Sequence, residues 1–201
     1  MESAALKDTY DYALKHASAG KLLNVATEDY AAARCLALNL LMHSLIMGAQ
    51  AAEKYLKGYL LLADPKRDVR RMSHSLSMLL GEVDALNPAA GLVRFSPLLQ
   101  RFERHYRIRY PDDPGGSTSM TTADIAELDQ FILHLNESLP CPFNYKYRIG
   151  LYAAITFSLG HAKTVTPKEH WIKEMNLALT PLLPRIASDY GRVIEALHPK
   201  E

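Results

Sequence analysis

One short stretch of the chain, residues 101–110 (RFERHYRIRY), concentrates side chains that bind anions. It contains four arginines and one histidine: Arg101, Arg104, His105, Arg107 and Arg109. A guanidinium group presents planar pairs of N–H donors that match phosphate or carboxylate, so arginine in place of lysine favours anion recognition. Tyr106 or Tyr110 adds an aromatic ring on which a nucleic-acid base can stack. The residue types therefore indicate a site for a nucleotide or another anion.

The spacing of these residues predicts that the charges avoid the protein core. We expect a helix over residues 96–110, with Ser96 as its N-cap, Pro97 in its first turn and its end before Pro111. At 100° per residue, the core face consists of Leu99, Phe102 and Tyr106. The stripe roughly opposite consists of Arg101, Arg104, His105 and Ile108, with Arg107 beside it. This stripe faces solvent or a partner.

A structural role is the alternative explanation for the same charges. Cations in the last turns of a helix interact favourably with its dipole, by about 0.3–1 kcal/mol each. Asp112 and Asp113 are placed to pair with Arg109, and Glu103 with Arg107 at i,i+4. On this interpretation Pro111 simply ends the helix. The sequence leaves both explanations open.

A second basic cluster precedes another expected helix. Residues 66–74 (KRDVRRMSH) place Lys66, Arg67, Arg70 and Arg71 in a loop just before a helix that starts near His74. The N-terminus of a helix attracts anions because its first N–H groups have no partner within the helix. If both basic clusters face one groove, they form a phosphate-binding surface. The alternative is an ordinary solvated loop.

The overall composition restricts the other possibilities. The formal net charge is only +1, so any binding to nucleic acid requires a local patch and not a general field. Cys35 and Cys141 are too few and too far apart for a disulfide scaffold or a zinc site. The histidines show no metal-ligand spacing, and no Gly-rich phosphate loop is present. We therefore expect no metal and no other cofactor.

The location of the protein follows from its N-terminus and from one apolar run. The first residues carry charges where a signal sequence would be apolar, so a cytoplasmic protein is expected. Residues 31–52 contain a single charged side chain, Arg34, and approach the length of a membrane span. Polar residues such as Asn39 and Gln50 interrupt the run. We expect a buried helix there and no membrane association.

Helical periodicity dominates the rest of the chain, and the expected fold class is all-α. We expect a helix near residues 6–17 that Gly20 ends, and one long run over 28–62 or two helices broken near Asn39 to Ser44. A helix capped by Ser73 follows, and another begins with the capping box Thr121 and Asp124.

The C-terminal third is also expected to be helical. Residues 145–160 alternate in part like a strand, but their context favours a helix. Thr166 with Pro167 predicts a helix start, and Thr180 with Pro181 another. The predicted organisation is an up-and-down bundle of four to five helices over residues 1–139. A helical extension, residues 140–201, then packs on the bundle or at a dimer interface.

Three stretches in this order resemble the HEPN domain family (higher eukaryote and prokaryote nucleotide-binding). They are AAEKYLKGYLLL (51–62), HSLSMLL (74–80) and RIRYPDD (107–113), and the resemblance covers roughly residues 28–139. It implies a bundle of four or five helices, often a homodimer, that binds a nucleotide or RNA. Many members of the family are metal-independent RNases or toxins, and many act beside a nucleotidyltransferase that serves as antitoxin.

The resemblance also implies a possible catalytic pair. The RNases of the family use an arginine and a histidine separated by four to six intervening residues, placed at the dimer interface. Arg67 and His74 have six residues between them and match the widest form. His74 would transfer a proton and Arg67 would stabilise the phosphate. The position two residues after the histidine is Leu76, where toxins often have tyrosine, so control by modification of that tyrosine has no target.

The sequence thus leaves three functions to compare. The first is a HEPN-like nucleotide- or RNA-binding module, with a nucleotidyltransferase as possible partner. The second is a metal-independent RNase that uses Arg67 and His74. The third is an interaction module whose arginines dock an acidic partner protein. The expected nucleotide- or RNA-binding residues are Arg70, Arg71, Arg101, Arg104, His105, Arg107, Arg109, Tyr110 and Asp112.

Overall fold

The computed structural model describes residues 4–39, 43–107, 121–160 and 165–197. Within these ranges the chain is all-α, as expected, and contains no strand. The α-helices are α1 (Ala4–Lys15), α2 (Ala17–Leu38), α3 (His43–Ala63), α4 (Leu76–Leu86), α5 (Ser96–Arg107), α6 (Thr122–Glu137), α7 (Phe143–Lys146), α8 (Gly150–Gly160), α9 (Pro167–Lys173) and α10 (Leu183–Leu197). Three short 3-10 helices are η1 (Pro88–Ala90), η2 (Leu92–Phe95) and η3 (Thr180–Leu182).

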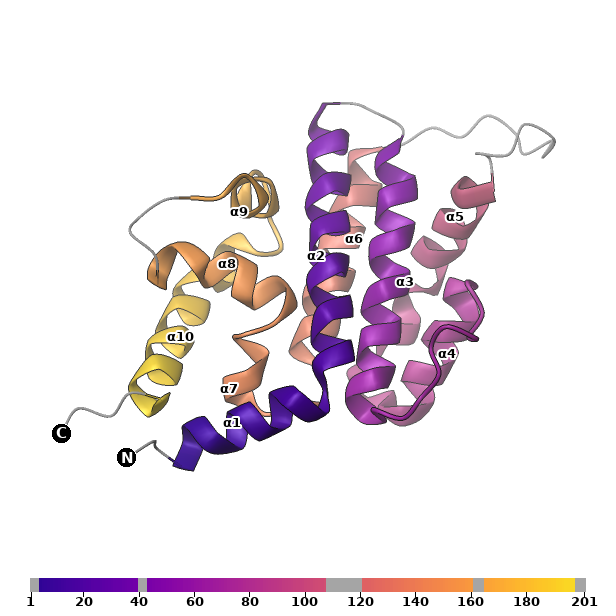
Figure 1. Ribbon diagram of the computed structural model, residues 1–201. Coiled ribbons are helices and arrows are strands. Elements are labelled where there is room, and N and C mark those ends of the chain that lie inside the picture. Colours follow the sequence, from indigo (N-terminus) through magenta and orange to yellow (C-terminus); the bar gives the residue numbers. More distant parts are fainter. Residues whose placement is uncertain (1–3, 40–42, 108–120, 161–164, 198–201) are drawn as a thin grey trace.

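The antiparallel pair α2 and α3 forms the centre of the molecule (Figure 1). The predicted break in the apolar run is confirmed, since α2 ends at Leu38 and α3 begins at His43. Helices α4 and α5 pack on α3, and α6 lies behind the pair. No helix in the described ranges combines the length and the apolar character that crossing a membrane requires.

The C-terminal helices pack against the bundle on its α2 side. Helices α8 and α9 contact α2, while α4 and α5 lie beyond α3 on the other side (Figure 1). Buried side chains from both parts, such as Leu23 of α2, Tyr152 of α8 and Ile172 of α9, belong to one hydrophobic core. The extension therefore leaves α5, which carries Arg101 and Arg104, uncovered.

Two glycines show how closely the C-terminal part approaches α2. Gly20 does not end the first helix, as the sequence suggested, but lies inside α2, where an added Cβ would come 2.9 Å from the Tyr145 hydroxyl. Its role is close packing. Gly150 begins α8 with a φ of 56°, a conformation that only glycine adopts without strain, and donates its N–H to Asn24 Oδ1 at 2.8 Å.

Capping side chains set several helix starts. The predicted box at α6 is confirmed, because the Thr121 side chain and Asp124 bond each other's backbone N–H groups. Thr166 Oγ1 accepts from the Glu169 N–H at 3.1 Å and starts α9, as predicted. At α4 the N-cap is Ser75 and not Ser73, since Ser75 Oγ accepts from the Met78 N–H. Residues 145–160, ambiguous in sequence, are helical apart from the turn before Gly150.

Candidate functional site

The loop between α3 and α4, residues 64–75, holds the basic cluster of residues 66–74 in a fixed path. Two aspartates shape it, because Asp64 Oδ1 accepts from the Lys66 N–H at 3.0 Å and Asp68 Oδ1 from the Arg70 N–H at 3.2 Å. Such aspartate turns order a chain without secondary structure. The loop therefore presents its basic side chains from a defined backbone.

The arginines of this loop point to different neighbours. Arg67 forms an ion pair with Glu82 of α4, and Arg71 Nε lies 3.2 Å from Asp68 Oδ2 on the surface. Arg70 is exposed and has no acidic partner within 4 Å among the described residues. Arg70 is thus a cation that the described part of the chain leaves without a counter-charge.

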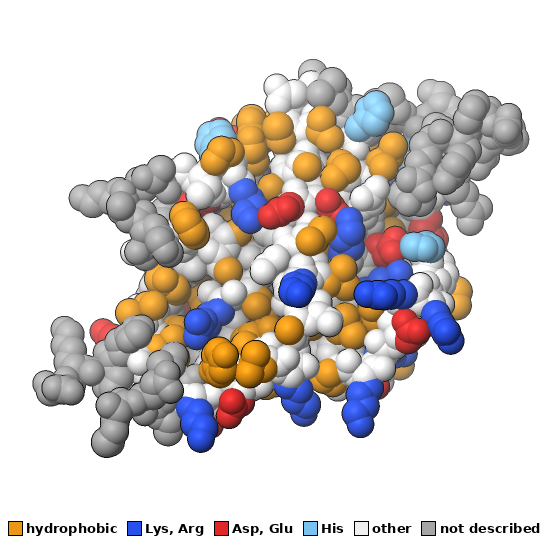
Figure 2. Space-filling model, viewed as in Figure 1, with side chains coloured by type: hydrophobic (Ala, Val, Ile, Leu, Met, Phe, Trp, Pro, Cys, Tyr) orange, Lys and Arg blue, Asp and Glu red, His pale blue; other side chains and the backbone are white. Residues whose placement is uncertain are grey.

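Arg67 and Arg70 line a cavity of about 430 Å³ that we call the α2–loop cavity. Its lining residues are Ser18, Lys21, Leu22, Val25, Leu61, Pro65, Arg67, Asp68, Val69 and Arg70. Among the described residues, three cations and one carboxylate thus surround a wall that is largely apolar. Figure 2, in the same view as Figure 1, shows Lys and Arg side chains spread among hydrophobic ones over the lower half of this face.

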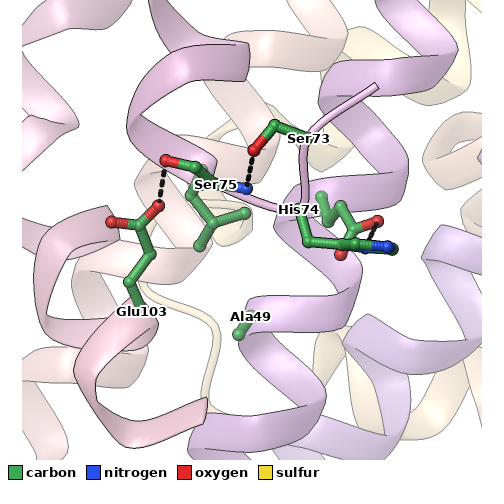
Figure 3. A pocket seen from close by; sticks show the side chains of 7 residues that line it. Ala49, Ser73, His74, Ser75 and Glu103 are labelled. Carbon is green, nitrogen blue, oxygen red and sulfur yellow. Dashed lines mark hydrogen bonds and ion pairs between the residues drawn. The ribbon is translucent and has the colours of Figure 1, made fainter. Parts of the chain in front are cut away.

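His74 lines a different and smaller cavity, of about 280 Å³, between α3, α5 and the start of α4 (Figure 3). Its ring is 74% exposed, and Nδ1–H donates to Glu53 Oε1 at 2.9 Å. Glu53 also accepts from Lys57 Nζ at 2.8 Å. Because a carboxylate only accepts, Nδ1 carries the proton of the neutral ring, and Nε2 is left as a proton acceptor.

The anion position at the start of α4 is occupied by a side chain of the protein itself. Glu103 of α5 accepts from Ser75 Oγ at 2.7 Å, from the Ser77 N–H at 3.1 Å and from Ser77 Oγ at 3.1 Å. Burial alone would raise the pKa of Glu103, but these hydrogen bonds outweigh it and lower that pKa below its usual 4.5. The sequence suggested that this helix end would attract a ligand, and Glu103 takes that place.

The basic cluster on α5 is directed partly toward α6. Arg101 Nε donates to Asp124 Oδ1 at 3.1 Å, and its terminal nitrogen donates to Glu127 Oε2 at 2.6 Å. Arg104 is exposed and has no acidic partner within 4 Å in the described ranges. Arg101 therefore has partners inside the chain, whereas Arg104 is available to a ligand.

His105 adds no charge to this cluster at neutral pH. Burial lowers the pKa of His105 from its usual 6.5, and Arg104 and Arg101 lower it further against the opposing effect of Asp124. Arg107 ends α5. Its side chain and all of Arg109, Tyr110 and Asp112 lie outside the described residues.

The structure thus separates the predicted site residues into three groups. Arg67 and Arg70 share the α2–loop cavity, His74 lies in the cavity beside Glu103, and Arg101 pairs with α6. Sequence reasoning missed Lys21, which is an isolated lysine on α2 with no local signal. In the described ranges no group of three or more His, Cys, Asp or Glu side chains is arranged to hold a metal ion.

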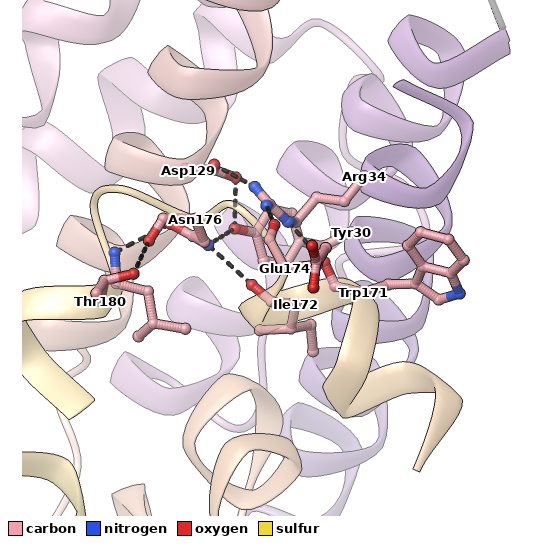
Figure 4. A network of polar contacts seen from close by, with 9 residues as sticks. Tyr30, Arg34, Asp129, Trp171, Ile172, Glu174, Asn176 and Thr180 are labelled. Carbon is pink, nitrogen blue, oxygen red and sulfur yellow. Dashed lines mark hydrogen bonds and ion pairs between the residues drawn. The ribbon is translucent and has the colours of Figure 1, made fainter. Parts of the chain in front are cut away.

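A buried polar network, which sequence reasoning also missed, lies on the other side of α2 (Figure 4). Arg34 pairs with Asp129 of α6, and its guanidinium also donates to the backbone oxygens of Trp171 and Glu174. Asn176 Nδ2 donates to Tyr30 Oη at 3.0 Å, and Tyr30 Oη donates to Asp129 Oδ1 at 2.6 Å. A signal existed, because Arg34 interrupts an apolar helix and Asp129 lies on the apolar face of α6.

Comparison of the chain with protein-family models, with curated proteins and with solved structures found no match. The function is therefore argued from the chemistry of the side chains. Two features carry that argument: the basic and apolar lining of the α2–loop cavity, and the exposed His74 with its Glu53 partner.

Proposed function

We propose that this chain is a HEPN-like module that binds a nucleotide or a short single-stranded RNA in the α2–loop cavity. One observation carries the proposal: Lys21, Arg67 and Arg70 line one cavity whose remaining wall is largely apolar. The cations match the phosphates, and the wall formed by residues such as Val25 and Val69 matches a base or sugar. A volume of about 430 Å³ lies in the range of small-ligand sites.

One contact supports the family resemblance behind this proposal. Glu53 belongs to the stretch AAEKYLKGYLLL and His74 to HSLSMLL, and the two side chains are hydrogen-bonded. A homodimer and a nucleotidyltransferase partner, which the resemblance implies, are part of the proposal. Light scattering tests the first, with a mass of two chains expected. Co-elution with a nucleotidyltransferase tests the second.

The cavity is tested by fluorescence anisotropy with a mant-labelled ATP and a short fluorescein-labelled RNA. Arg70→Glu and Lys21→Glu are each expected to weaken binding by roughly tenfold or more, the effect of losing one charge-assisted phosphate contact. For RNA, log affinity falls as log salt concentration rises, and each lost phosphate contact makes that slope shallower by about 0.7. Arg192→Glu makes the same charge change on α10 and serves as control.

Other results would redirect or overturn the proposal. If Arg101→Glu with Arg104→Glu removes binding while the cavity variants retain it, the ligand lies at α5. If neither probe binds the parent protein, nucleotide binding is wrong. An acidic protein partner that is lost in the Arg101→Glu, Arg104→Glu double variant would then support the interaction module.

A second candidate, a metal-independent RNase, is favoured by the position of His74. Its ring is exposed and is oriented by Glu53 through Nδ1, which leaves Nε2 of the neutral ring for the role of a general base. Arg67 and His74 line separate cavities within one chain, and the resemblance implies a pair at a dimer interface, so in this candidate Arg67 of one copy acts with His74 of another. RNA cleavage in EDTA that is lost in both His74→Ala and Arg67→Ala would establish it.

A further inference from the structure

A larger cavity of about 580 Å³ lies between α2 and the C-terminal helices, and we call it the α2–α8 cavity. Asn24 and Glu28 of α2 line one side, Arg148 and Phe157 lie on the α8 side, and Lys168 closes it from α9. None of the residues that line the α2–loop cavity lines this one. It is therefore a separate site, and what it binds does not depend on the function proposed above.

The charged side chains of this cavity leave a net positive charge. Arg148 is exposed and has no acidic partner within 4 Å among the described residues. Lys168 Nζ lies 3.4 Å from Glu28 Oε1, and both side chains are substantially exposed, at 37% and 63%. Such a long, solvated pair is weak. Among the described residues, two cations therefore face one carboxylate, which favours a ligand with a single negative charge.

The opposite wall is apolar and is built by one face of α8. Ala153 and Phe157 are four residues apart and lie on the same side of the helix, and both line the cavity. At the α2 side, Asn24 Oδ1 accepts from the Gly150 N–H at 2.8 Å, so the Asn24 amide nitrogen is left as a donor. The cavity thus combines cations, one amide donor and an aromatic ring, which is the usual composition of a small-ligand site.

We infer that the α2–α8 cavity binds a small amphipathic monoanion, in which one acidic group is joined to an apolar or aromatic body. The acidic group lies between Arg148 and Lys168, and the body lies against Ala153 and Phe157. Glu28 has the opposite effect on the same ligand, because its carboxylate neutralises Lys168 and repels a second negative charge. A polyphosphate is for that reason a poor ligand here.

Two fluorescent probes that differ by one charge test the inference. 8-Anilinonaphthalene-1-sulfonate carries a sulfonate, and N-phenyl-1-naphthylamine has the same rings without it. Arg148→Gln is expected to lower the affinity for the sulfonate probe by roughly tenfold and to leave the affinity for the neutral probe unchanged. Glu28→Gln is expected to raise the affinity for the sulfonate probe several-fold. Arg192→Gln, a charge change on α10, is expected to alter neither.

The apolar wall and the position of the site are tested with the same probes. Ala153→Trp fills the cavity and is expected to lower the affinity for both probes by more than tenfold. If Ala153→Trp does not fold, Phe157→Ala provides a second test. It is expected to lower the affinity for both probes several-fold. Equal sulfonate affinity in the parent, Arg148→Gln and Glu28→Gln proteins would overturn the inference. Loss of the sulfonate probe in Lys21→Glu would also overturn it, because the probe would then occupy the α2–loop cavity.

Discussion

Arg34 of α2 and Asp129 of α6 form an ion pair that is almost completely removed from solvent, with side chains 1% and 4% exposed. Burying two charges is costly, and it is tolerated where every donor and acceptor is satisfied. The C-terminal part supplies what the pair lacks, since Arg34 Nε donates to the Trp171 oxygen at 2.8 Å. The pair therefore couples the central helices to α9.

Removing one member of this pair is expected to be much worse than removing both. Arg34→Met leaves the Asp129 carboxylate buried without its counter-charge, and a loss of about 3–5 kcal/mol in the free energy of unfolding is expected. The double variant Arg34→Met, Asp129→Leu should lose less free energy of unfolding than the sum of the losses in the two single variants. Urea denaturation of the parent, the two single variants and the double variant measures the coupling energy between Arg34 and Asp129. Strictly additive losses in the free energy of unfolding would contradict that coupling.

The same network predicts that residues 1–139 do not fold as the full chain does. Removing residues 140–201 takes away two backbone acceptors of Arg34 and the Asn176 amide that donates to Tyr30. It also exposes the apolar faces of α2 that pack on α8 and α9. The truncated chain is expected to lose the sharp thermal transition of the parent in circular dichroism. A cooperative transition at an unchanged midpoint would instead show that the bundle is an independent domain.

Local signals in the sequence were sufficient for most of the helices. The capping box at Thr121 and the start at Thr166 depend on residues only three positions apart, and both are confirmed. Gly20 was misread because its neighbour is Tyr145, which only the folded chain brings close. A glycine that serves close packing has the same sequence signature as one that ends a helix.

The site was predictable only in part, for a similar reason. The basic residues are visible in the sequence, but their partners come from other helices: Glu82 for Arg67, and Asp124 and Glu127 for Arg101. These carboxylates decide which cations remain for a ligand. Lys21 joins Arg70 at one cavity although 49 positions separate them in the chain, from 21 to 70. No local pattern carries that information.

Glu103 is expected to stabilise the start of α4 in a pH-dependent way. Glu103→Gln removes the charge of the carboxylate that accepts hydrogen bonds from Ser75 and Ser77. The free energy of unfolding is expected to fall by about 1 kcal/mol at pH 7. Because the pKa of Glu103 is lowered in the folded protein, its contribution is complete above the unfolded value of about 4.5. The contribution disappears as the pH falls through the lower, folded pKa.

Urea denaturation of the parent and of Glu103→Gln at pH 7 and pH 3 measures this effect. The difference in the free energy of unfolding should be largest at pH 7 and should shrink at pH 3. Glu195→Gln, on the exposed side of α10, controls for a general change in charge. An equal difference at both pH values would contradict a role for the Glu103 charge.

His105 reports whether an anion binds at α5. Its pKa lies below 6.5 because of burial and of the nearby Arg104 and Arg101, so the folded protein binds this proton less well than the unfolded chain. Stability therefore falls as the pH drops from 6.5 through the folded pKa. Arg104→Gln should raise the pKa of His105 by removing a like charge, and Asp124→Asn should lower it by removing an opposite one.

The same histidine separates the two basic clusters when a nucleotide is added. A phosphate bound beside Arg104 would raise the pKa of His105, because the negative charge favours the imidazolium. Binding in the α2–loop cavity, as proposed, should leave that pKa unchanged even when the nucleotide is saturating. The ring-proton chemical shift of His105, followed by NMR against pH with and without ATP, gives the answer. An upward shift that disappears in Arg104→Gln would move the ligand to α5 and exclude the cavity as its site.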